Sequence, residues 1–204
     1  MTEILIVYYS RQGATAELAR HAARGVESVS GCTATLRTVP PLSAENERPV
    51  KVVPDAGAPY ATNDDLRRAD GLLLGSPTRF GNMAAPLKYF LDGTSSLWLD
   101  GTMAGKPAGM FSSSQTLHGG QESTLLTMAI PLLHHGMMVL GLPFTEHGVN
   151  HTRTGGTPYG ATHVAGMASQ PGVLSDDEIA LAQALGRRIA DVAATLAAGR
   201  AARR

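Results

Sequence analysis

Residues 4–15 read Ile-Leu-Ile-Val-Tyr-Tyr-Ser-Arg-Gln-Gly-Ala-Thr, and this stretch decides the fold class. Its first six residues form a nearly continuous apolar run rich in β-branched side chains, which is typical of a strand buried on both faces of a parallel sheet. Small and polar residues then interrupt the run. Residues 18–29 carry apolar side chains at three- and four-residue steps, which predicts a helix, and residues 34–39 can form a second strand. The chain therefore opens with a predicted βαβ unit.

The same alternation continues along the rest of the chain. Further apolar runs predict strands at residues 72–75, 108–111 and 137–142. Apolar stripes predict helices at residues 83–91, 121–134 and 176–196. Ser175 and Glu178 have the spacing of a capping box at the start of the last helix. Five strands alternating with helices predict an α/β fold, a doubly wound five-stranded parallel sheet flanked by helices.

The length of 204 residues predicts a single domain, over residues 1–198, with a frayed tail at 199–204. Two long loop excursions are longer than the connections that a doubly wound five-stranded sheet needs. Residues 40–63 hold five prolines, and residues 145–172 are rich in glycine, threonine and histidine. Loops of this length are uncommon in compact domains and are usually functional. They can be surface excursions, or they can build a subunit interface or cover an active site.

Composition excludes several classes of protein. The 17 basic and 17 acidic residues cancel, so we expect no nucleic-acid partner. The single cysteine excludes a disulfide framework and any cysteine-based metal site, and no third ligand is spaced to join the His134-His135 pair. The first residues lack the basic start of a signal peptide, and no apolar stretch is long enough to cross a bilayer. We expect a cytoplasmic protein with no bound metal and no membrane insertion.

Polar loops follow three of the predicted strands, at the strand ends where open α/β sheets bind ligands. They comprise residues 10–15, 76–82 and 112–122, and each offers hydroxyls, backbone amides and glycines before a helix. The first loop contains no carboxylate and opens onto a helix N-terminus, which favours a phosphate group. For any single loop, an ordinary capped turn remains the alternative.

Common nucleotide and catalytic motifs are missing from these loops. No Gly-x-Gly-x-x-Gly follows the first strand, and no Walker A loop occurs. No Gly-x-Ser-x-Gly nucleophile elbow occurs either. The first strand does not end in acidic residues, which disfavours a phospho-aspartate receiver of the same topology.

Two longer blocks of sequence are not general features of α/β proteins, and together they are highly specific. They are Pro77-Thr78-Arg79-Phe80-Gly81-Asn82 and Gly155-Gly156-Thr157-Pro158-Tyr159-Gly160-Ala161. Shorter motifs accompany them at Val7-Tyr8-Tyr9-Ser10, Gly13, Phe90-Leu91-Asp92, Leu97-Trp98, Phe111-Ser112-Ser113, Gly119-Gly120-Gln121-Glu122 and His134-His135-Gly136-Met137. In order and spacing, from residue 4 to about residue 195, the chain resembles the flavodoxin-like, FMN-dependent NAD(P)H:quinone oxidoreductases of the WrbA type.

The resemblance implies a flavodoxin-like homodimer or homotetramer with FMN as cofactor and NADH or NADPH as co-substrate. It implies a ping-pong cycle, in which the nicotinamide reduces the flavin and leaves, and a quinone then takes two electrons in the same pocket. The residues implied in cofactor binding are Ser10, Arg11, Gln12, Gly13, Ala14, Thr15, Pro77, Thr78, Arg79, Phe80, Asn82, Ser113, Ser114, Gln115, Thr116, Leu117, His118, Gly119 and His134.

The resemblance also implies substrate-binding and catalytic residues. Gln12 and Trp98 would contact the substrates. His134 would reach the flavin edge from a neighbouring strand end, where it would polarise the flavin or assist proton delivery. The chain departs from the family pattern at two places, and these departures leave the choice between NADH and NADPH open. Family members often have an aromatic residue at the position of Gln12. The third loop is one residue longer than in the family, with Leu117-His118 where glycines are usual.

A flavodoxin-type FMN electron carrier without quinone reductase activity is the alternative function. Such carriers are usually strongly acidic monomers. The zero formal charge and the two long excursions of this chain argue against that alternative.

Overall fold

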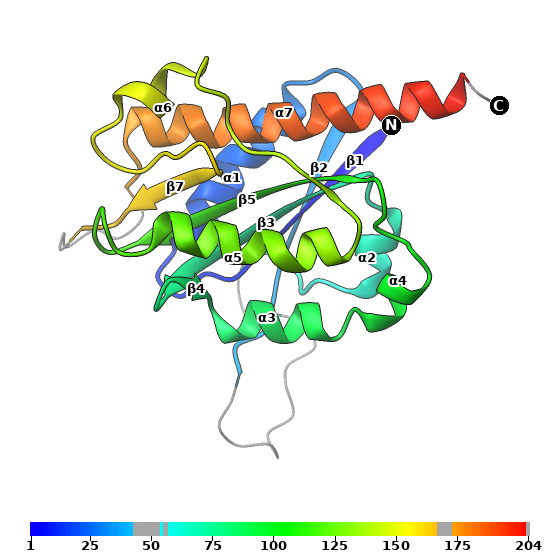
Figure 1. The fold of residues 1–204 in the computed structure, drawn as a ribbon, viewed down its shortest axis with the longest axis horizontal. Helices are drawn as coiled ribbons and strands as arrows, with labels where there is room; N and C mark the ends of the chain where they lie inside the picture. Colours follow the sequence, from blue (N-terminus) through cyan, green and yellow to red (C-terminus); the bar gives the residue numbers. More distant parts are fainter. Residues whose placement is uncertain (43–53, 55–56, 167–172, 203–204) are drawn as a thin grey trace.

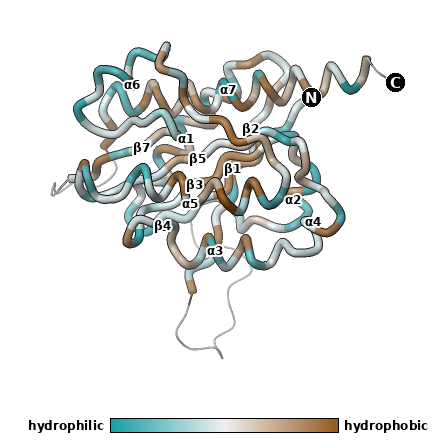
Figure 2. The backbone as a smooth tube through the Cα atoms, in the orientation of Figure 1, coloured by the Kyte–Doolittle hydropathy of each residue, from teal (hydrophilic) through white to brown (hydrophobic). Residues whose placement is uncertain are grey.

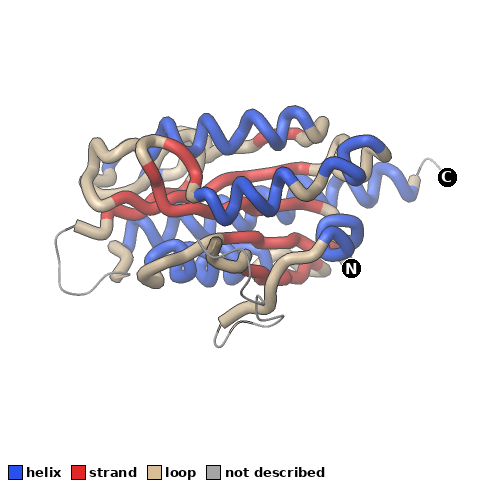
Figure 3. Tube along the Cα trace, turned by 90° about the horizontal axis from the view of Figure 1, so that it is seen from below, coloured by secondary structure: helices blue, strands red, loops and turns tan. Residues whose placement is uncertain are grey.

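A computed structural model describes residues 1–42, 54, 57–166 and 173–202. The strands are β1 (Thr2–Tyr8), β2 (Cys32–Thr38), β3 (Gly71–Arg79), β4 (Asn82–Met83), β5 (Pro107–Ser114), β6 (Met138–Val139) and β7 (Ala161–Val164). The helices are α1 (Ala14–Glu27), α2 (Asn63–Arg68), α3 (Ala85–Asp92), α4 (Ser95–Leu99), α5 (Gln121–His134), α6 (His147–His151) and α7 (Asp176–Ala201). Helices cover both faces of the central sheet (Figure 1 and Figure 3). No helix of the described part of the chain is long and apolar enough to cross a membrane.

The strand order β2-β1-β3-β5-β6 confirms the predicted doubly wound parallel sheet. Two short strands share the fifth position. β6 pairs with the start of β5, and β7 pairs with its end, from Phe111 to Ser114. The prediction of one continuous strand over residues 137–142 is therefore wrong. Gly141 and Pro143 interrupt the strand after two residues, and the second excursion returns to the sheet as β7.

β1 is buried on both faces, as its apolar run predicts. Ile4, Ile6 and Tyr8 pack in a core with α1 and α7. Leu5 and Val7 pack in a second core with α3 and α5. Each fully buried aliphatic side chain of this kind contributes about 1.5–3 kcal/mol. Figure 2 shows the hydrophobic backbone segments concentrated in these central strands.

β3 and β5 extend beyond their predicted ends into residues expected to form loops. Ser76 pairs with Ser112 and Pro77 with Ser113 in the parallel register, and β4 pairs antiparallel with the last residues of β3. These polar residues are strand residues because a neighbouring backbone pairs with them. An apolar pattern could not reveal this.

Several helix predictions also change. The short helices α2, α4 and α6 were not expected, since five or six residues are too few to display an apolar stripe. The capping box is confirmed, because the Glu178 amide donates to Ser175 Oγ and the Ser175 amide donates to the Glu178 carboxylate. α7 continues to Ala201, so residues 199–201 of the expected frayed tail are helical. Most of the first excursion lies outside the described residues.

Candidate functional site

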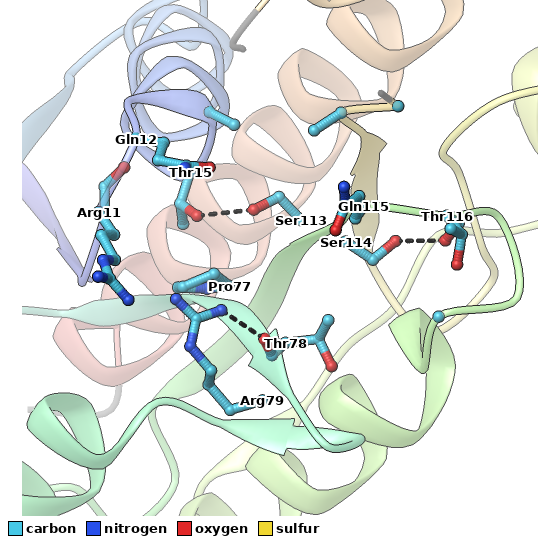
Figure 4. A pocket seen from close by; sticks show the side chains of 15 residues that line it. Arg11, Gln12, Thr15, Pro77, Thr78, Arg79, Ser113, Ser114, Gln115 and Thr116 are labelled. Carbon is cyan, nitrogen blue, oxygen red and sulfur yellow. Dashed lines mark hydrogen bonds between the residues drawn. The ribbon is translucent and has the colours of Figure 1, made fainter. Parts of the chain in front are cut away.

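A cavity of about 570 Å³ lies at the carboxyl ends of β1, β3 and β5 (Figure 4). The sheet topology brings together the three loops predicted from the sequence and adds the end of β7. The lining residues are Ser10, Arg11, Gln12, Ala14, Thr15, Pro77, Thr78, Arg79, Ser113, Ser114, Gln115, Thr116, Gly119, Ala165 and Gly166. The cavity sits where the strand order reverses between β1 and β3, the usual ligand position of an open α/β sheet.

The loop after β1 is arranged around the Ser10 hydroxyl. Ser10 Oγ accepts hydrogen bonds from the Gly13 amide at 3.2 Å and the Ala16 amide at 3.3 Å. Gly13 has a φ of 93° and immediately precedes α1, a conformation that favours glycine. The amides of Ala14 and Thr15 donate to no other described residue. They are therefore available, together with the helix dipole, to bind an anion.

Hydroxyl groups connect the first and third loops beneath the cavity. Thr15 Oγ1 lies 2.9 Å from Ser113 Oγ in a buried contact that joins the first loop to β5. Ser114 Oγ donates to the Thr116 carbonyl at 2.7 Å and accepts from Gln121 Nε2 at 2.9 Å. These bonds hold the wall in place without a ligand, which reduces the ordering cost of binding.

The charge around the cavity is positive. Arg11 and Arg79 line it, and no aspartate or glutamate does so among the described residues. Arg79 Nη1 donates to the Thr78 carbonyl at 2.7 Å. Figure 4 shows both guanidinium groups on the side of the cavity away from Thr116. Cations without a lining carboxylate favour an anionic ligand.

The residues present fit FMN. Backbone amides and hydroxyls at the start of α1 suit its phosphate. Pro77, Thr78, Ser114 and Thr116 also line the cavity, and their hydroxyls and backbone groups can form hydrogen bonds with a polar ring. The cavity volume lies within the range of roughly 300–1,000 Å³ found for cofactor sites.

Other predicted residues lie around the cavity without lining it. Gly13 shapes the first loop, and the side chain of Phe80 is fully exposed at the β3–β4 turn. Asn82 borders a neighbouring groove, and Leu117 and His118 border another.

His134 and Trp98 lie at the opposite end of the molecule from the cavity. His134 is the last residue of α5, whose first residue, Gln121, is beside the cavity. At 1.5 Å per residue, about 20 Å of helix separates the two ends. The prediction that His134 approaches from a neighbouring strand end is therefore wrong, because the histidine belongs to a helix end. Trp98 is half-exposed on α4, and α4 lies near that end of α5 (Figure 1), where Thr94 Oγ1 is 2.9 Å from His135 Nε2.

Sequence reasoning missed Ala165 and Gly166 as lining residues. They follow β7, which was hidden inside the second excursion. β7 reads Ala-Thr-His-Val. This mixture of apolar and polar residues carries no clear strand pattern, and four residues are too few to distinguish a strand from a loop.

The fold and this cavity define a flavodoxin-like α/β protein. Residues 2–148 match the family described as NADPH-dependent FMN reductase, and the chain belongs to that family. A relative named NAD(P)H dehydrogenase (quinone), from Solidesulfovibrio magneticus, is 44% identical over 96% of this chain and 99% of its own length. A relative of the same name from Geobacter sulfurreducens is 44% identical over 95% and 98%.

Solved structures support the same fold. A WrbA-like flavodoxin from Agrobacterium tumefaciens superposes with a TM-score of 0.66 at 23% identity and covers 96% of this chain and 99% of its own. An archaeal flavodoxin superposes with a TM-score of 0.62 at 19% identity, over 95% and 99%. The flavodoxin-like expectation is thus confirmed.

Proposed function

We propose that this protein reduces quinones to hydroquinones by two electrons, with FMN as its bound cofactor and NADH or NADPH as its reductant. The observation that carries the proposal is the cavity itself. It combines a helix N-terminus, hydroxyls from three strand ends and two guanidinium groups in a chain of this family. The 44% identity to two curated quinone dehydrogenases supports the reaction class. We propose the cytoplasm as the compartment, since reduced nicotinamide nucleotides are available there.

In this proposal the loop residues position the cofactor. The amides of Ala14 and Thr15 hold the phosphate, with Ser10 keeping their loop curled. Thr78 and Ser114 orient the ring through their polar groups. FMN, when bound, accepts a hydride from the nicotinamide and passes two electrons to the quinone. Gln12, at the mouth of the cavity, contacts the entering substrate.

We further propose that a second copy of the chain supplies His134 and Trp98 to each site, in a homodimer or homotetramer. Neither residue reaches the cavity of its own chain. α5 carries an exposed apolar stripe at Leu126, Ile130 and Leu133, with the helical spacing of an unpaired face. Exposed apolar patches of this kind mark protein interfaces, and this stripe ends at His134.

The competing function, a flavodoxin-type electron carrier, uses the same cofactor but no hydride donor. The balanced charge and the exposed α5 stripe favour the oxidoreductase, since small electron carriers work as charged monomers. Oligomeric mass and the stability of the one-electron flavin radical distinguish the two functions.

The test is an absorption spectrum of the protein reconstituted with FMN, followed by anaerobic titration with NADH or NADPH and then benzoquinone. Bleaching by a nicotinamide nucleotide and recovery with quinone are the expected results. FMN binding without bleaching by either nucleotide would support the electron carrier. Failure to bind FMN would refute the cofactor assignment.

A further inference from the structure

A second, larger groove of about 970 Å³ adjoins the first cavity. It runs from the end of β1 along α3, as far as the last residue of that helix, Asp92. The residues common to the cavity and the groove are Arg11 and Arg79. Both guanidinium groups therefore stand at the boundary between the two spaces, within reach of a ligand that occupies either one.

The groove carries excess positive charge. Its cations are Arg11, Arg79 and Lys88, against the single carboxylate of Asp92. Lys88 Nζ pairs with Asp92 at 2.5 Å, whereas no carboxylate in the described parts of the chain pairs with either arginine. Since the whole chain has zero formal charge, this local excess favours anions at this place.

Aromatic surface lines the same groove beyond the arginines. The side chain of Tyr89 is 67% exposed on α3, and Tyr9 lies half-buried after β1. Exposed aromatic rings are stacking surfaces for nucleobases. The groove thus joins two phosphate-binding groups to a base-stacking surface, and it continues directly from the cavity assigned to FMN.

We propose that this groove, here called the α3 groove, binds the ADP-ribose half of NADH or NADPH. This inference rests on the proposed function and extends it to the nucleotide. Arg11 and Arg79 contact the pyrophosphate, because a guanidinium matches phosphate oxygens in a two-pronged geometry. Tyr89 stacks against the adenine, and Lys88 adds charge at the outer end. The nicotinamide can then enter the first cavity while the charged half stays outside.

The charge pattern argues against the other candidate occupants. A quinone is neutral and gains nothing from two guanidinium groups. A nucleic acid needs a longer basic surface than this net-neutral chain provides. An acidic segment of a second copy is the remaining occupant, and the experiment distinguishes it from a nucleotide.

The experiment is calorimetric titration of the FMN-loaded protein with ADP-ribose, which lacks the nicotinamide. Lys88→Ala and Tyr89→Ala alter the α3 groove outside the first cavity. Arg188→Ala, which removes an exposed cation of α7, is the matched control. We expect ADP-ribose to bind, with an affinity that falls as salt rises. Each groove variant should weaken binding about threefold to tenfold, with the control unchanged.

Kinetics provide a second readout. For the groove variants, the KM of the nicotinamide nucleotide should rise by a similar factor, while the KM of benzoquinone stays constant. If the nucleotide reduces FMN in the wild type but ADP-ribose does not bind, the groove inference is wrong and the proposed function stands. If ADP-ribose binds through Lys88 and no reduction occurs, the groove inference stands and the proposed function fails. If Tyr89→Ala lowers the molecular mass in solution without changing ADP-ribose affinity, a second copy occupies the groove and the inference is overturned.

Discussion

Phe80 stands in the two-residue turn between β3 and β4 with a φ of 52°, and Gly81 follows with a φ of 75°. Positive φ at both positions is typical of a type I′ hairpin turn, in which Asn-Gly is the preferred pair. A phenylalanine in this conformation costs about 1–2 kcal/mol. Its exposed ring recovers none of that cost in the isolated chain, which points to a contact made with a ligand or another subunit.

We therefore expect Phe80→Asn to raise the free energy of unfolding of the cofactor-free protein by roughly 1 kcal/mol. Urea denaturation measures this change. Phe80→Ala is the control, because it removes the ring but keeps a β-carbon at positive φ. Equal stability of the two variants would contradict the strain argument.

Glu178 is a buried carboxylate that connects three segments. It accepts hydrogen bonds from His163 Nδ1 at 2.8 Å, the Gly155 amide at 2.8 Å, and the amides of Val164 and Ser175 at 2.9 Å. Burial acts to raise the pKa of this carboxyl, but the hydrogen bonds outweigh burial and hold the pKa below its ordinary value. Glu178 therefore ties β7 and the second excursion to the start of α7.

A lowered pKa in the folded state makes Glu178 a source of stability that is fully present above its unfolded-state pKa. That stability is lost as the pH falls through the folded-state pKa. We expect Glu178→Gln to lower the free energy of unfolding at pH 7 by about 3 kcal/mol and to flatten the pH dependence below about pH 4.5. Asp176→Asn, on the exposed side of the same helical turn, is the control. Parallel pH profiles for wild type and Glu178→Gln would exclude this role.

At the scale of the element, α1 and α7 pack at very short distance through glycines. A β-carbon at Gly186 would lie 2.0 Å from the Ala22 carbonyl oxygen, and one at Gly25 would lie 2.0 Å from the Gln183 carbonyl oxygen. Backbone at such distances cannot accommodate a methyl group unless the helices separate. Both glycines are therefore required by packing, although glycine weakens a helix.

We expect Gly186→Ala to destabilise the protein by roughly 3 kcal/mol, even though alanine is the better helix former. Gly199→Ala, in the same helix with no atom near its β-carbon position, should instead stabilise it by up to about 1 kcal/mol. Thermal denaturation of the two variants tests the pair. Stabilisation by both substitutions would show that the two helices can separate at little cost.

At the scale of the whole molecule, the cavity and His134 occupy opposite ends of α5. A single chain cannot bring them together without unfolding that helix. If a second copy supplies His134, assembly through the α5 stripe becomes a condition for activity. The rate of quinone reduction would then depend on protein concentration as well as on FMN.

Ile130→Glu, which places a charge in the middle of this stripe, should convert the assembly to monomers. We expect FMN binding to persist and the quinone reductase rate to fall roughly tenfold or more, because the neighbour's residues are lost. Light scattering and steady-state kinetics measure the two effects. Val173→Glu, at another exposed apolar position, is the control. A monomeric variant with full activity would refute the role of a second copy.

Patterns among neighbouring residues were enough to predict the local features of this protein. The doubly buried β1, the α5 helix and the capping box at Ser175 were all predictable, because periodicity and caps are properties of neighbouring residues. The three polar loops could be placed at strand ends for the same reason, and a sheet with this topology brings strand ends together.

The remaining features depend on how distant segments of the chain pack together. β7 belongs to the sheet because β5 offers unpaired backbone there, and the cavity residue Gly166 follows this strand. The polar ends of β3 and β5 are strands because they pair with each other. The packing of the helices and strands places His134 far from the cavity. The same packing places a positively charged groove next to the cavity. These features depend on contacts between segments distant in sequence, which no local pattern encodes.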